Sequence, residues 1–152
     1  MKFRFRLEPV LGHRARIEGE RAGQHAQMVA DQVAAQRVVD DIRLQRDVLR
    51  DRLVREHAEF DAETLRSTYL HLDYLDRAIV AAVQRLEACI DETERARLRL
   101  VDAARDRKVL ETLKERRRET FQLDAALADQ RELDDQNARL FDRAQAYEGF
   151  SP

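Results

Sequence analysis

The sequence is poor in the residues that interrupt helices. It holds only 4 Gly and 2 Pro in 152 residues. Both prolines lie near the ends, at Pro9 and Pro152, and no glycine stands between Gly23 and Gly149. Because a helix interior tolerates these two residue types least, the long middle of the chain is expected to be helical.

Cysteine and long apolar runs are scarce as well. With Cys89 as the single cysteine, no disulfide can form within the chain. No apolar stretch approaches the roughly 20 residues that a membrane-spanning helix needs. Residues 1–11 carry charges among their apolar residues, so they lack the continuous apolar core of a secretory signal. These absences predict a cytoplasmic protein.

The motifs of the common catalytic and cofactor sites are missing. The sequence has no phosphate-binding loop, dinucleotide-binding turn or nucleophile elbow. The histidines are too widely spaced to share one helix face as metal ligands, and Cys89 joins none of them in a local ligand motif. The carboxylates resemble partners in surface ion pairs rather than a desolvated acid and base. We therefore expect no enzyme activity, metal, cofactor or small-molecule substrate.

Charge is abundant and is balanced between the two signs. Charged residues make up 38% of the chain and hydrophobic residues 43%, a mixture that favours long helices. The 28 Lys+Arg and 30 Asp+Glu nearly cancel, which argues against nucleic acid or an acidic membrane as the partner of the whole molecule. Opposite charges one turn apart, as in Asp73 with Arg77, are typical of solvated helix faces.

Two apolar seams with the 3.5-residue spacing of coiled coils predict two long helices. Four polar residues, Arg14, Arg21, His25 and Arg46, interrupt the first seam. Its apolar members are Leu7, Leu11, Met28, Ala35, Val39, Ile42, Leu49, Leu53 and Phe60. The second seam contains Leu72, Leu75, Ile79, Val83, Leu86, Ile90, Leu100, Ala104 and Leu110, and continues after a phase shift through Leu113, Leu127 and Phe141.

These seams predict an all-α fold, a single antiparallel coiled-coil hairpin over residues 1–152 whose second helix is longer than the first. The first helix is expected at about 9–63, the turn at about 64–72, where Thr64, Ser67 and Thr68 cluster, and the second helix at about 73–147. Folding the chain there pairs residue i with about 136 minus i. The end of the second helix, with Leu140 and Phe141, is then either a docking surface or a frayed tail.

Two further patterns have a functional and a structural interpretation. A stripe of small residues on the first helix either allows close approach of a partner or, as we prefer, makes room for Phe121 and the arginines of the facing helix. Its members are Gly12, Ala15, Gly19, Gly23, Ala26, Ala30 and Ala34. A basic patch from Arg105 to Arg118 either meets an acidic protein or is a solvated face. Its few interleaved aromatic residues argue against nucleic acid.

Three segments taken together resemble the FliJ family of flagellar type III export. They are FRFRLEPVLGHRARIEGE at residues 3–20, STYLHLDYLDRAI at 67–79 and RKVLETLKERRRETFQLD at 107–124. Their order and spacing, together with the chain length, carry a likeness that spans nearly the whole chain.

The resemblance implies a non-enzymatic component of the flagellar export apparatus, similar to the central stalk of rotary ATPases. Its terminal half would enter the ring of the export ATPase, its tip would contact the export gate membrane protein FlhA, and it would escort export chaperones. It would be cytoplasmic and peripherally associated with the inner membrane through the apparatus. Two alternatives stay open: the injectisome counterpart of the stalk, and a freestanding coiled-coil chaperone or scaffold whose imperfect seam opens to clients.

The resemblance also suggests contact residues. Carried over by position, the gate contact falls on Leu75 and Ala78, with Tyr69, His71 and Leu72 in the adjoining region. Because the end of the first helix has no aromatic residue apart from Phe60, no gate contact is assigned there. The contact with the ATPase ring is assigned to Arg107, Lys108, Lys114, Arg116, Arg117, Phe121, Leu140 and Phe141.

Overall fold

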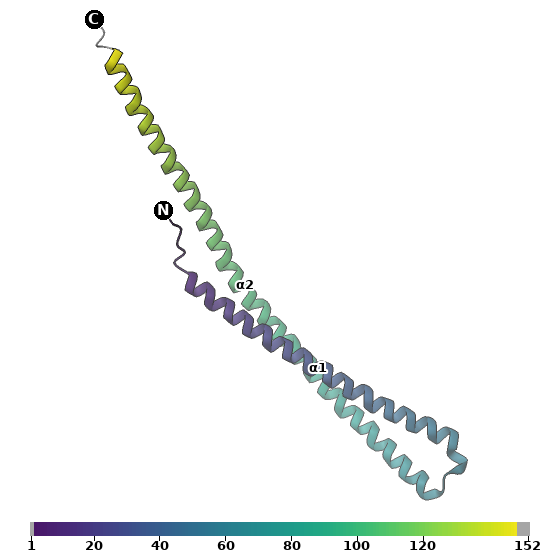
Figure 1. Ribbon diagram of the computed structural model, residues 1–152. Coiled ribbons are helices and arrows are strands. Elements are labelled where there is room, and N and C mark those ends of the chain that lie inside the picture. Colours follow the sequence, from purple (N-terminus) through teal and green to yellow (C-terminus); the bar gives the residue numbers. More distant parts are fainter. Residues whose placement is uncertain (1, 149–152) are drawn as a thin grey trace. The chain divides into compact units, whose positions relative to one another are not determined.

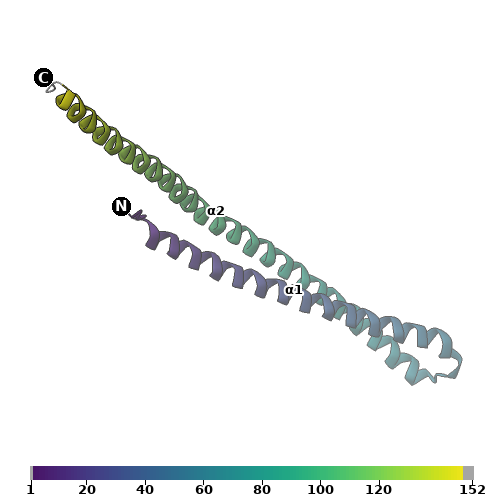
Figure 2. The same cartoon turned by 45° about the horizontal axis from the view of Figure 1, so that its top comes forward.

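Two α-helices and one short 3-10 helix make up the chain. The computed structural model describes residues 2–148, with side chains up to Leu140. Helix α1 spans Glu8–Glu56, η1 spans His57–Glu59 and α2 spans Ala62–Glu148 (Figure 1). The helices contain 49 and 87 residues and run antiparallel, side by side in a second view (Figure 2). The predicted all-α hairpin with a longer second helix is confirmed.

The connection between the helices comes earlier than the predicted turn at 64–72. It consists of η1 with Phe60 and Asp61, and residues 64–72 are helical instead. The hydroxyl groups of Ser67 and Thr68 donate to the Thr64 carbonyl at 3.0 and 2.7 Å, so they are satisfied inside a helix. A cluster of hydroxyl residues was therefore a misleading turn signal.

Asp61 begins α2 in place of the expected Asp73. The Thr64 backbone N–H donates to Asp61 Oδ1 at 2.8 Å, which satisfies one of the donors that a helix N-terminus leaves unpaired. Hydrogen bonds from Thr64 hold the pKa of Asp61 below its usual value. Asp73 lies inside the helix and pairs with Arg77 one turn later. The Arg52 guanidinium covers the Phe60 ring at 5.8 Å and closes the connection from the side of α1.

Contacts divide the chain into two units, residues 15–104 and residues 1–14 with 105–152. In the first unit the predicted α1 seam is confirmed. Its apolar members Met28, Ala35, Val39, Ile42, Leu49 and Leu53 are all buried or half-buried. Val39, at 1% exposure, is the most completely buried side chain among the residues described. Arg21, His25 and Arg46 occupy half-buried positions in the same seam, so it is only partly apolar.

The α2 seam of this unit differs in part from the prediction. Leu72, Leu75, Ile79, Leu86 and Leu100 face α1 as expected, but Ile90 is 44% exposed. A heptad series of small residues holds the other positions: Ala82, Cys89, Ala96 and Ala103. The prediction favoured the larger apolar neighbours Val83 and Ile90, which follow the same seven-residue spacing one position later along the helix.

The stripe of small residues on α1 does not lie against α2. All seven of its members are exposed, and a Cβ added at Gly12, Gly19 or Gly23 would meet no atom within 4 Å. The expectation that this stripe makes room for Phe121 and the facing arginines is therefore wrong. In the unit of residues 15–104, the small residues in the α2 seam, such as Cys89 and Ala96, make room for the long side chains of α1 instead.

The second unit joins the N-terminal segment to a later part of α2. The Glu8 backbone N–H donates to the Phe5 carbonyl at 3.2 Å and starts α1, whose first turn accepts Pro9 because proline lacks the N–H that would stay unpaired there. Phe5 is buried at 6% exposure. The rings of Phe3 and Phe121 lie 5.7 Å apart.

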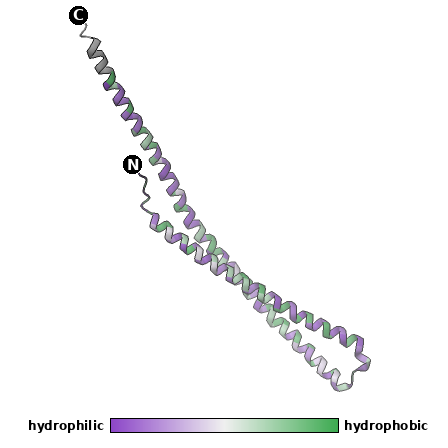
Figure 3. Cartoon of the chain, viewed as in Figure 1, coloured by the Kyte–Doolittle hydropathy of each residue, from purple (hydrophilic) through white to green (hydrophobic). Residues whose placement is uncertain are grey.

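The antiparallel overlap ends earlier than the predicted pairing implies, because the turn comes earlier. Phe121 already lies opposite Phe3, so the described side chains of α2 from about residue 122 to residue 140 lie beyond the overlap with the N-terminal segment. From Gln122 to Leu140 every side chain except that of Ala125 is exposed. Figure 3 shows hydrophilic residues with single hydrophobic ones between them along this end of α2.

Candidate binding surfaces

Two of the residues assigned to an ATPase-ring contact meet residues of the N-terminal part of the chain. The Lys114 ammonium donates to the Glu8 carboxylate at 2.8 Å, and Phe121 contacts Phe3. Arg107 is half-buried and pairs with Glu111 on its own helix. Lys114 and Phe121 therefore help to hold the second unit together.

The other residues of that set whose side chains are described are open to solvent. Lys108, Arg116 and Arg117 are exposed, and Leu140 is 63% exposed. The Phe141 side chain falls outside the described residues. A shallow hollow with an apolar floor and a basic rim lies on α2 near Lys108 and Arg116. Val109, Thr112 and Leu113 line its floor and Arg105, Lys108 and Arg116 its rim.

The residues assigned to the tip divide between the seam and the surface. Leu72 and Leu75 are buried against α1, at 9% and 3% exposure, and Ala78 is half-buried. Tyr69 is 55% exposed, and the exposed His71 ring stacks near the Tyr74 ring with centroids 6.1 Å apart. Only Tyr69 and His71 of this set are therefore open to a partner without separation of the helices.

Sequence reasoning missed two exposed apolar residues beside Tyr69. Leu70 is 62% exposed and Tyr74 63% exposed, and both face away from α1. They belong to the segment that carries the family likeness, but they stand outside the apolar seam. The sequence does contain a signal for them. Leu70 and Tyr74 stand outside the 3.5-residue repeat, where a large apolar side chain stays exposed to solvent.

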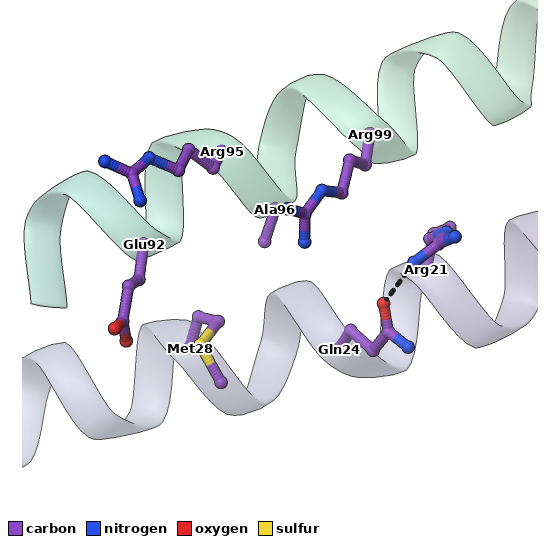
Figure 4. Close-up of a pocket in the computed structure, with 7 residues that line it drawn as sticks. All are labelled: Arg21, Gln24, Met28, Glu92, Arg95, Ala96 and Arg99. Atoms are coloured by element: carbon purple, nitrogen blue, oxygen red, sulfur yellow. Dashed lines mark hydrogen bonds between the residues drawn. The ribbon is translucent and has the colours of Figure 1, made fainter.

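A cleft between the helices of the first unit is lined by three arginines. Figure 4 shows Arg95, Arg99 and Ala96 on α2 and Arg21 and Met28 on α1. The Arg21 guanidinium donates to the Gln24 amide oxygen at 2.9 Å. Along the described part of the chain, no group of three or more acidic, histidine or cysteine side chains is placed to hold a metal ion.

Polar contacts tie the two helices together at several seam positions. The half-buried Arg46 guanidinium donates to Asp47 at 2.7 Å and lies 3.7 Å from Asp76 on α2. The hydrogen bond to Asp47, with the charges of both carboxylates, raises the pKa of Arg46 above its usual value. Farther along, the Thr93 hydroxyl donates to the Cys89 carbonyl at 2.8 Å and lies 3.1 Å from the Met28 carbonyl.

Fold and surfaces together define a two-helix, coiled-coil-like hairpin. None of the helices described is long and apolar enough to cross a membrane. The chain belongs to the FliJ family, because the model of that family, Flagellar FliJ protein, matches residues 2–146. It is thus a component of the flagellar protein export apparatus, and the family is a non-enzymatic one. Neither a curated protein nor a solved structure matches the chain.

Proposed function

We propose that this chain is a central-stalk-like link between the export ATPase ring and the export gate, and that it also escorts export chaperones. The observation that carries the proposal is the stretch of α2 after Phe121, whose described side chains are nearly all exposed. A long helix with no intramolecular cover suits insertion into a surrounding ring. The proposal places the protein in the cytoplasm, associated with the inner membrane through the gate, here taken to be FlhA-like.

Three exposed bases of α2, Lys108, Arg116 and Arg117, support a ring contact. Long-range attraction by such residues speeds encounter with an acidic surface, and close pairs then contribute to affinity. Lys114 and Phe121 would act indirectly, since their contacts with Glu8 and Phe3 hold the N-terminal segment against α2. Arg107 pairs with Glu111 on α2 itself.

Charge reversal of the exposed bases tests the ring contact. The variant Lys108→Glu, Arg116→Glu and Arg117→Glu should lower capture of the cognate export ATPase and lose its activation. A matched control reverses three exposed arginines of α1, Arg37→Glu, Arg43→Glu and Arg50→Glu, and alters net charge equally. Equal loss in both variants, or retention in both, would remove the basic surface from the proposal.

The tip surface around Tyr69 and Tyr74 supports a gate contact. Exposed aromatic residues contribute large contact areas at low entropic cost, and are enriched in binding sites. Tyr69→Ala with Tyr74→Ala should weaken binding to the soluble domain of the gate protein while ATPase binding persists. Leu44→Ala with Val48→Ala, equally exposed on α1, is the control. Unchanged gate binding would refute this placement.

A freestanding chaperone is the second candidate, and the polar seam favours it. Arg21, His25 and Arg46 occupy half-buried positions where apolar residues would bind the helices together more tightly. Such a seam opens more readily, which would allow client helices to replace one arm. The flagellar identity of the family favours the flagellar system over the injectisome alternative.

A disulfide that locks the hairpin separates the two candidates. Met28→Cys with Thr93→Cys, in a Cys89→Ser background, joins the helices where they approach closely. A stalk should keep ATPase and gate binding when locked, whereas an opening chaperone should lose its clients. Reduction of the disulfide provides the control within the same sample.

A further inference from the structure

A stripe of exposed apolar residues runs along α2 from Val109 to Leu140. It is formed by Val109, Leu123, Leu133 and Leu140, which are between 59% and 67% exposed. Their spacings of 14, 10 and 7 residues are close to multiples of the coiled-coil repeat. Val109 lies five residues before Lys114, which contacts Glu8 on α1, so Val109 is on roughly the opposite side of the helix from that contact. The stripe is therefore an additional apolar seam on α2, distinct from the one that packs against α1.

Charge is segregated along the same part of α2. Residues 105–118 contain seven Lys and Arg against three Asp and Glu, whereas residues 122–140 contain five Asp and Glu against two Arg. The hollow around Val109 has only bases at its rim, among them Lys108 and Arg116. Asp124, Asp129, Glu132, Asp134 and Asp135 supply the acidic segment, and all are exposed. One helix thus presents a basic segment and an acidic segment joined by one apolar stripe.

We propose that two copies of this chain pair antiparallel along the stripe, the basic segment of each against the acidic segment of the other. A twofold axis between residues 124 and 125 places Val109 opposite Leu140 of the other copy, Leu123 opposite Ala126 and Leu133 opposite Arg116. Residues 109–118 then face residues 131–140, whose acids are Glu132, Asp134 and Asp135. A parallel pair would set basic against basic and acidic against acidic, which like-charge repulsion disfavours. The proposal rests on charge and apolar pattern alone and stands independently of the proposed stalk function.

Polar residues at repeat positions between the members of the stripe indicate a reversible dimer. Arg116 and Glu119 occupy repeat positions between Val109 and Leu123. Polar residues in a coiled-coil seam fix register at a cost in affinity. About 33 residues of each helix, roughly 50 Å, would take part. The dimer would cover Lys108 and Arg116, so the same surface would be hidden from any other acidic partner.

Sedimentation of the full chain tests the dimer. Between about 1 and 100 µM the wild type should shift from monomer to dimer, and about 0.5 M salt should weaken the association. The basic-reversed variant (Lys108→Glu, Arg116→Glu, Arg117→Glu) and the acid-reversed variant (Glu132→Arg, Asp134→Arg, Asp135→Arg) should each associate at least about tenfold more weakly. An equimolar mixture of the two should recover a dimer, because their charges are complementary again.

Controls distinguish this surface from general charge or folding effects. Arg37→Glu, Arg43→Glu and Arg50→Glu should leave the dimer intact, and circular dichroism should report wild-type helix content for every variant. Val109→Gln with Leu133→Gln should weaken association, whereas Val33→Gln with Val48→Gln on α1 should not. A chain that stays monomeric throughout, or a dimer that neither reversal weakens, overturns the proposal.

Cysteine crosslinking tests the direction of pairing. In a Cys89→Ser background, a mixture of Val109→Cys and Leu140→Cys chains should form the mixed disulfide on mild oxidation. Exclusive pairing of Val109→Cys chains with each other would contradict the antiparallel arrangement. If the wild type is a monomer and the Val109→Gln variant fails to capture the export ATPase, this surface binds the ATPase. The dimer proposal then fails, whereas the stalk proposal stands.

Discussion

Individual seam residues differ widely in how much they contribute to stability. Val39 is almost completely buried, whereas its neighbour Val38 is 50% exposed. Both are valines in the same helix and have the same helix propensity. A difference between substitutions at the two positions therefore reports the effect of burial alone. Most other seam positions are only half-buried or hold small or polar residues.

We expect Val39→Ala to lower the free energy of unfolding by about 2 kcal/mol, because it removes two buried methyl groups from a packed site. Val38→Ala should alter it by less than about 0.5 kcal/mol. Thermal or urea unfolding followed by circular dichroism measures both. Equal effects would mean that the seam near Val39 is not packed as described.

Asp61 makes stability depend on pH through its cap on α2. Its folded pKa is lowered, so its contribution is fully present above the unfolded value of about 4 and is lost as pH falls through the folded pKa. Asp61→Ala should lower the melting temperature by about 2–4 °C at pH 7, with little difference from wild type at pH 2. Asp61→Asn keeps the cap without the titration, so its advantage over the alanine variant should persist at low pH.

At the scale of elements, α1 contains glycines at positions where no close contact within the hairpin requires a glycine. Gly19 and Gly23 lie in the helix interior and face open space. Each Gly→Ala change should therefore stabilise the helix by up to about 1 kcal/mol. Ala26→Gly on the same stripe should destabilise it by a similar amount. If Gly19→Ala and Gly23→Ala instead reduced stability, the stripe would have to be in contact after all.

The helices were predictable from the sequence, whereas their junction and their faces were only partly so. Periodicity located both seams because Leu72, Leu75 and Ile79 repeat over many turns. The turn was misplaced because Thr64, Ser67 and Thr68 satisfy their hydroxyl groups either in turns or inside a helix. Asp61, a capping residue just before a helical run, was the better signal.

The candidate surfaces were harder to predict because exposure depends on pairing register. A shift of the turn by a few residues changes which part of α2 lies opposite each residue of α1. Phe121 was expected to lie well inside the overlap, yet it marks its end at Phe3. Of the five tip residues, Leu72 and Leu75 are buried against α1 and stabilise the hairpin, whereas Tyr69 is exposed. This difference depends on the contacts between the two helices.

For the whole molecule, the last part of α2 should be dispensable for folding. Beyond Ala125 the described side chains are all exposed up to Leu140. A chain that ends after Ala125 should keep the melting temperature of the hairpin within about 2 °C, measured at low concentration, while total helix signal falls. A large drop in melting temperature would show that the end of α2 supports the hairpin.

The position of the turn also has a consequence for folding kinetics. Arg46 and Asp76, near the turn, are separated by far less chain than Glu8 and Lys114 or Phe3 and Phe121. Closing the shorter loop costs less chain entropy, so contacts beside η1 should form first and the helices should then pair progressively toward the termini. Substitutions around Leu53 and Leu72 should thus slow folding, whereas those around Phe3 and Phe121 should mainly speed unfolding.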